Sequence, residues 1–180
     1  MNTETENNFL VITASGKDKL GLVEQLTGRI TDSSCNIEES SMAVMGGQFS
    51  LIMRISGAWL ALSKLEGQIP PLGEQLGLAI TQQRTGKSER IAAIPYTVEA
   101  VAIDRPGIVR NLAAFFTRNG INIEELQTST YFAPHTGSPL TSVIMTVGIH
   151  AKIHIPSLRE DFLDYCDELN LDATLEPMRG

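Results

Sequence analysis

The sequence predicts an α+β protein that contains the same module twice, with four strands and two helices in each copy. When the chain is shifted by 86 positions (104 − 18), nine of the 22 residues in segment 18–39 are identical to those in segment 104–125. A second match pairs SLIM at 50–53 with SVIM at 142–145. In both copies the apolar residues change from strand-like to helix-like spacing in the same order.

Module one is expected over residues 1–85. Its first helix places Leu22, Leu26 and Ile30 at helical spacing, and Gly46-Gly47 between two strand-like runs indicates a hairpin. The second helical stretch contains Pro70-Pro71, which we expect to divide it into two pieces. The expected elements are a strand at 9–14, a helix at 22–33, strands at 36–45 and 49–55, a helical stretch at 58–77 and a strand at 78–84.

Module two is expected over residues 95–180, after a linker at 86–94. Its first helix ends at Gly120, a good C-terminal stop, and its second helix opens with Pro156. The expected elements are a strand at 96–103, a helix at 107–119, strands at 122–131 and 141–149, a helix at 155–169 and a strand at 171–176.

This β-α-β-β-α-β order predicts, in each module, a four-stranded antiparallel sheet with both helices on one face, the ferredoxin-like arrangement. A module this small buries a thin core. We therefore expect the modules to pack against each other or against a second chain, which includes a homodimer.

Charge and composition exclude several classes of protein. The chain has 14 basic and 21 acidic residues and a net charge of −7, so we expect no direct binding to nucleic acid. Residues 1–6 are acidic and polar, unlike a signal peptide, and no apolar run is long enough to cross a membrane. We expect a soluble cytoplasmic protein with no membrane partner, in which Cys35 and Cys166 are buried free thiols.

Catalytic and metal sites are not indicated. His150 and His154 flank a strand-to-helix junction, so they do not share one helical face. Glu38-Glu39 and Glu124-Glu125 are neighbours on strands, and we expect each pair to point to opposite faces of its sheet. We therefore expect no enzyme activity, no metal and no cofactor.

The turn between the first strand and the first helix of each module is the candidate binding site. Asp18 and Gly21, and likewise Asp104 and Gly107, place an acid and a glycine where a helix begins. The free N–H groups there suit a carboxylate, and glycine permits close approach. The aspartate could pair with an ammonium group, while Asn36 or Asn122 offers an amide. Together they would hold both ends of a free α-amino acid. The alternative is that the acids and amides are ordinary turn and cap residues.

The segment DRPGIV at 104–109, an amphipathic helix and NGINI at 119–123 together resemble the signature of ACT domains, which are small amino-acid-sensing modules. The resemblance covers both copies and is stronger in module two, because module one has Leu20 in place of the proline. It implies a ligand at the strand–helix loop, often between two modules. The implied contact positions are Asp104, Gly107, Ile108 and Asn122 in module two, and Asp18, Gly21, Leu22 and Asn36 in module one.

By the same resemblance, the chain is a regulator that senses glycine or a similar small amino acid. It would repress transcription by contacting a protein partner, a DNA-bound transcription activator, because its acidic surface is unsuited to DNA. The alternative is a detached regulatory subunit that gives a metabolic enzyme amino-acid feedback control.

Overall fold

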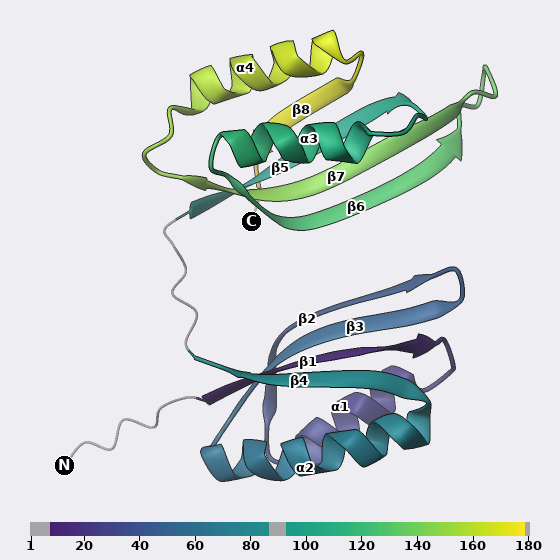
Figure 1. The fold of residues 1–180 in the computed structure, drawn as a ribbon, viewed down its shortest axis with the longest axis vertical. Coiled ribbons are helices and arrows are strands. Elements are labelled where there is room, and N and C mark those ends of the chain that lie inside the picture. The colour runs from purple at the N-terminus through teal and green to yellow at the C-terminus, as the bar shows by residue number, and fades with distance from the viewer. Residues whose placement is uncertain (1–7, 87–92, 179–180) are drawn as a thin grey trace. The chain divides into compact units, whose positions relative to one another are not determined.

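The computed structural model describes residues 8–86 and 93–178. The chain divides into two compact units, Met1–Glu89 and Arg90–Gly180, which contain module one and module two (Figure 1). Of the predicted linker, residues 87–92 lie outside the described residues, while Ala93 and Ile94 already belong to the first strand of module two. No helix in segments 8–86 and 93–178 combines the length and apolar character needed to span a membrane.

Each module has the predicted element order. Each sheet has four antiparallel strands, in the order β2-β3-β1-β4 in module one and β6-β7-β5-β8 in module two. Both helices of a module cover the same face of its sheet (Figure 1). The tandem ferredoxin-like fold is therefore confirmed. The elements of module one are β1 Asn8–Lys17, α1 Leu22–Asp32, β2 Asn36–Met45, β3 Gln48–Gly57, α2 Trp59–Leu76 and β4 Leu78–Thr85. Those of module two are β5 Ala93–Ile103, α3 Ile108–Arg118, β6 Asn122–Phe132, β7 Pro139–His150, α4 Ile155–Glu168 and β8 Asp172–Pro177.

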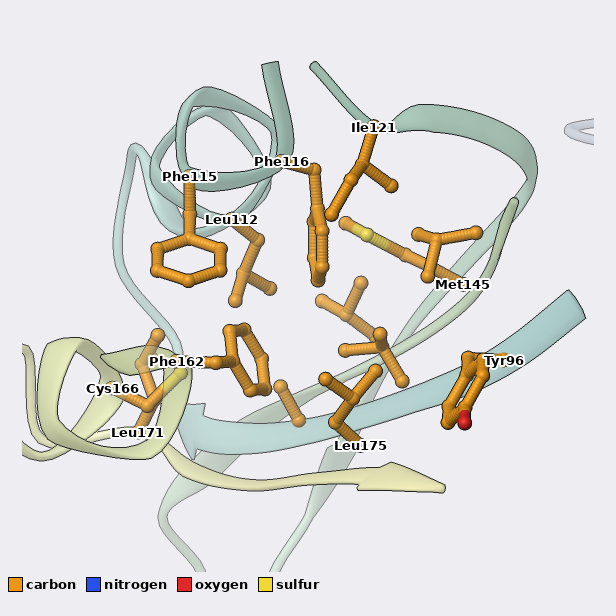
Figure 2. Packing of buried hydrophobic residues seen from close by; sticks show 14 of the residues in the cluster. Tyr96, Leu112, Phe115, Phe116, Ile121, Met145, Phe162, Cys166, Leu171 and Leu175 are labelled. Atoms are coloured by element: carbon orange, nitrogen blue, oxygen red, sulfur yellow. The ribbon is translucent and has the colours of Figure 1, made fainter. Parts of the chain in front are cut away.

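The core of each module lies between its sheet and its two helices. In module one, alternate residues of β3 face the helices and are buried, as the period of two requires. In module two the core contains a cluster of aromatic rings from both helices (Figure 2). The ring centroids of Phe116 and Phe162 are 5.3 Å apart, and Phe115 lies 5.4 Å and 5.2 Å from these two rings. These rings join α3 to α4 above the sheet.

Helix α2 corrects the prediction that Pro70-Pro71 divides it. The helix is continuous from Trp59 to Leu76 with both prolines inside. Pro70 has no N–H for the carbonyl of Glu66, and the Gln82 side-chain amide donates to that oxygen instead, at 3.0 Å. Beyond the prolines, Leu72 and Leu76 are buried. Burying two leucines contributes roughly 3–6 kcal/mol, which is comparable to the cost of about 6 kcal/mol for two prolines at about 3 kcal/mol each.

Both cysteines are free thiols. Cys166 is buried in the core of module two, and burial raises the pKa of its thiol to about 12. Cys35 is half-buried, not fully buried as expected, and burial raises the pKa of its thiol as well. Both groups are therefore protonated at neutral pH.

The second residue after the first helix differs between the modules, and it provides a stability test. Ser34 has φ of +58° and the equivalent Gly120 has φ of +66°, so a serine occupies a left-handed conformation that favours glycine. We expect Ser34→Gly to stabilise module one by about 0.5–1 kcal/mol, and Gly120→Ala to destabilise module two by about 1 kcal/mol. Urea unfolding followed by fluorescence of Trp59, the single tryptophan, reports on module one. An unchanged or lower midpoint for Ser34→Gly would contradict the strain.

Candidate functional site

The predicted site residues Asp18 and Asp104 lie directly after the first strand of their modules, in a loop tied to the neighbouring hairpin. The N–H of Asp18 donates to the carbonyl of Gly47 at 3.0 Å, and the N–H of Asp104 donates to the carbonyl of Pro139 at 2.9 Å. The first helix follows after Gly21 in one module and Gly107 in the other, with φ of +87° and +97°. Glycine is needed at both positions because a side chain would be strained there.

The N-termini of α1 and α3 open toward these loops. The first backbone hydrogen bond of each helix runs from Gln25 to Gly21 at 3.1 Å, and from Asn111 to Gly107 at 2.9 Å. The N–H groups of the three preceding residues, 22–24 and 108–110, have no acceptor within the helix. Neither helix has a side-chain cap at its N-cap glycine. These N–H groups, with the positive end of the helix dipole, suit an anionic group.

The carboxylate of Asp104 is held by a residue that the sequence did not single out. The Thr141 hydroxyl donates to Oδ1 of Asp104 at 2.5 Å, and Thr141 is only 4% exposed. This bond holds one oxygen of the carboxylate, and the second oxygen makes no hydrogen bond or ion pair within the described residues. The sequence repeat could have pointed to Thr141, because Thr141 occupies the position that the buried Phe49 has in module one.

Asp18 has no equivalent of the Thr141 hydrogen bond, because Phe49 stands at that position and its side chain cannot donate one. Within the described residues, the Asp18 carboxylate makes no hydrogen bond or ion pair. Two homologous loops therefore present their acids differently. In module two the carboxylate is fixed by a buried hydroxyl, and in module one it stands exposed at the loop.

A basic side chain ties each loop to the end of the second helix of its module. Nζ of Lys19 donates to the carbonyl of Leu76 at 3.3 Å, and the guanidinium of Arg105 donates to the carbonyl of Leu169. These carbonyls lie at the C-terminal ends of α2 and α4, where a cation is favourable. Lys19 and Arg105 therefore hold the loops in place.

The amides do not join the aspartates within a module. Asn36 opens β2 and lies across from Ser56, which pairs with Phe9 near the start of β1. Asp18 follows the other end of β1, nine residues away, which corresponds to roughly 30 Å along a strand. Asn122 lies across from Gly148 at the corresponding far end of β7. A small molecule bound in a single module therefore cannot contact both the aspartate and the asparagine. Both residues are close to the first helix in the sequence, but a full strand length separates them in the structure.

The structure also corrects the prediction that Glu38 and Glu39 point to opposite faces of their sheet. A β-bulge at Glu38 shifts the register between Ile37 and Glu39, and both glutamates then lie on the sheet face away from the helices. Glu38 accepts a hydrogen bond from Ser56 at 2.5 Å and one from Asn36 at 3.4 Å. These bonds lower the pKa of Glu38, so it is held as a carboxylate and is not poised as a general acid.

The same bulge occurs in module two. The register shifts between Ile123 and Glu125, and Gly148 leaves room for the carboxylate of Glu124, because a β-carbon at position 148 would lie only 2.5 Å from Oε1 of Glu124. Over segments 8–86 and 93–178, no group of three or more acidic, histidine or cysteine side chains is placed to hold a metal. Both bulges lie in edge strands, β2 in module one and β6 in module two.

A hollow of about 360 Å³ lies at the α1 loop of module one. Three of the predicted site residues line it, whereas Asn36 does not. Its lining residues are Asp18, Lys19, Leu20, Gly21, Leu22, Val23, Glu24, Met42, Val44 and Phe49.

Comparisons with known proteins find a family match over module one and a relative that matches nearly the whole chain. The ACT domain family model matches residues 8–83. The glycine cleavage system transcriptional repressor of Escherichia coli (strain K12) is 30% identical over 175 residues, which cover 96% of this chain and 92% of the relative.

Two crystal structures share the fold over nearly the full length. An unknown protein from Galdieria sulphuraria has a TM-score of 0.77 at 26% identity, covering 97% of this chain and 100% of its own. A structure provisionally assigned as a glycine cleavage system transcriptional repressor has a TM-score of 0.72 at 24% identity, covering 97% and 99%. At that identity it supports the fold alone.

Proposed function

The chain belongs to the ACT-domain family, as a two-module relative of the glycine cleavage system transcriptional repressor, and we propose that it is an amino-acid-responsive repressor of that system. The observation that carries the proposal is the 30% identity to the repressor over 92% of the repressor's length. We assign the chain no enzyme activity, in keeping with this regulatory relative.

The effector site is assigned to the loop of module two. A small amino acid such as glycine would place its carboxylate at the N–H groups of Gly107 and Ile108. Its ammonium would pair with Asp104, which the buried Thr141 hydroxyl already orients. A preorganised partner of this kind binds with less entropic cost.

The route of repression is assigned to protein contact. The net charge of −7 disfavours binding to phosphates, so the chain would act on a DNA-bound transcription activator in the cytoplasm. Glycine, when bound, would change the affinity for that partner, because a ligand shifts a binding equilibrium through its coupling energy.

The test uses the purified full chain, glycine cleavage promoter DNA and the activator that binds that DNA. At about physiological salt, the chain alone should not shift the DNA, and it should shift the activator–DNA complex in a glycine-dependent way. A shift of the DNA by the chain alone would overturn the indirect route. A glycine-dependent complex with a metabolic enzyme, and none with the activator, would instead support the feedback subunit.

A further inference from the structure

Helix α4 of module two has an acidic surface that is exposed to solvent. Its fourteen residues include five acids and one base, Arg159. Arg159 contacts β8 instead of the acids, because its Nε donates to the carbonyl of Leu175 at 2.9 Å and its guanidinium lies 3.7 Å from the carboxylate of Glu176. All five acids are exposed, and among the described residues none of them makes a side-chain hydrogen bond or an ion pair. These acids are Glu160, Asp161, Asp164, Asp167 and Glu168.

Three of the acids line a hollow of about 340 Å³ between α3 and α4. They lie three and four residues apart, so they share one face of α4 over about two turns, roughly 10 Å. Buried Phe115 of α3 and half-buried Tyr165 of α4 supply aromatic surface, with ring centroids 5.4 Å apart. Aromatic side chains beside exposed charged ones are typical of a surface that binds a protein. This acidic hollow is lined by Phe115, Arg118, Asn119, Asp161, Asp164, Tyr165 and Glu168.

One cation stands in the same lining. The guanidinium of Arg118 lies 5.9 Å from the centre of the Tyr165 ring, and within segments 8–86 and 93–178 it forms no ion pair with the carboxylates of the hollow. Three negative charges and one positive charge leave the lining with a net charge of −2 (1 − 3). The carboxylates therefore outweigh Arg118, and the hollow favours a cationic partner.

Helix α2, the counterpart of α4 in module one, is much less acidic. Its eighteen residues include one base, Lys64, and two acids, Glu66 and Glu74. Glu66 is already paired with Arg84, whose Nε lies 2.8 Å from Oε1 of Glu66. The acidic hollow is thus a feature of module two and does not follow from the shared fold.

We propose that the acidic hollow docks a basic segment of the DNA-bound activator, through two or more lysine or arginine side chains. This inference rests on the proposed function and names the surface that meets the partner. A protein that binds DNA carries lysine and arginine to neutralise phosphates, so the activator has the complementary charge. Exposed carboxylates attract and orient such a partner during encounter. The aliphatic stems of its basic side chains would lie against Phe115 and Tyr165.

The exposure of the carboxylates favours a protein segment over a small cation. A single exposed ion pair contributes little to affinity, so stable binding needs several pairs together with apolar contact. A protein segment supplies both, because it presents several basic side chains on one surface. Among the residues that the structure describes, no group of three or more acidic, histidine or cysteine side chains is placed to hold a metal.

The acidic hollow is separate from the proposed effector loop. Gly107 precedes α3 and Arg118 ends it, and eleven residues (118 − 107) correspond to roughly 16 Å along the helix. Changes to the α4 side of the hollow should therefore leave glycine binding intact. Glycine affinity can thus be measured independently of docking.

The test measures the affinity of the full chain for the activator bound to glycine cleavage promoter DNA, at the glycine concentration that gives the tightest wild-type binding. Asp164→Asn/Glu168→Gln removes two charges of the hollow with little change in shape or helix propensity. We expect the affinity to fall about tenfold or more, because close interfacial charges are lost, while glycine binding measured by calorimetry is unchanged. Glu160→Gln/Asp167→Asn is the matched control, since it removes one Asp and one Glu of the same helix outside the hollow. Its affinity should change by less than about threefold.

Removing the cation should act in the opposite direction. Arg118→Gln takes away the one positive charge of the lining, so it should tighten binding to the activator by about threefold. Unchanged or weaker binding in this variant would overturn the assignment of a basic occupant.

The double variants distinguish failure of the inference from failure of the proposed function. A loss of affinity confined to Asp164→Asn/Glu168→Gln, with glycine binding kept, supports docking at the hollow. An equal loss in both double variants reports only long-range charge and overturns the inference, as does an unchanged affinity in the hollow variant, and in both cases the proposed function stands. A wild-type chain that binds no activator at any glycine concentration overturns both.

Discussion

Replacing Phe116 with alanine is expected to lower the free energy of unfolding of module two by about 3–5 kcal/mol, the largest effect of any single change considered. The Phe116 side chain is fully buried and its ring packs against those of Phe115 and Phe162 (Figure 2). Truncation removes the transfer free energy of the ring, leaves a cavity between α3 and α4, and breaks two aromatic contacts. A small domain has only about 5–15 kcal/mol of stability, so module two should unfold at much lower denaturant concentration.

The chain carries optical probes that separate the two modules. All three tyrosines, Tyr96, Tyr131 and Tyr165, lie in module two, and Trp59 lies in module one. Tyrosine near-ultraviolet circular dichroism during urea unfolding should therefore show the loss. Phe132→Ala is the matched control, because Phe132 is 73% exposed and its removal should change stability by no more than about 0.5 kcal/mol. A cost below about 1 kcal/mol for Phe116→Ala would contradict the packing of this core.

The second large effect is expected for Asp104→Ala, which should weaken glycine binding by about ten- to a hundredfold. The change removes a charge-assisted pair with the ammonium of the ligand, a loss of roughly 1.5–3 kcal/mol. Calorimetric titration of glycine into wild type and variant measures it directly. Asp18→Ala should affect glycine much less, because no buried hydroxyl orients Asp18 and its hollow has apolar walls.

Two further variants separate the effect of the Asp104 charge from the effect of its orientation by Thr141. Asp104→Asn keeps an oxygen that accepts from the Thr141 hydroxyl and loses only the charge, so it should weaken glycine binding nearly as much as alanine does. Thr141→Val keeps the side-chain shape and removes the orienting bond, and it should give an intermediate loss. Unchanged glycine affinity in both Asp104 variants would leave Asp104 as a turn residue.

Much of the fold could be predicted because its signals are local. The hairpin at Gly46-Gly47 follows from two consecutive glycines, both with positive φ, and the first helices follow from apolar residues at helical spacing. The repeat then carried each assignment from one copy to the other. The placement of the aspartate and the glycine in each loop could also be predicted. They are close in the chain, and the loop brings them together without any distant partner.

Only the tertiary structure decided what depends on pairing across the sheet. Helix α2 stays continuous through Pro70-Pro71 because Gln82 of β4 supplies the missing donor and the sheet buries the leucines beyond the prolines. The bulge at Glu38 turns both glutamates to one face, which adjacent residues of a regular strand cannot do. Thr141 reaches Asp104 from 37 positions away, while Asn36 lies a full strand length from Asp18. Sequence periodicity records which face a residue prefers, but the distance between two residues is set by strand register, and register is a property of two segments together.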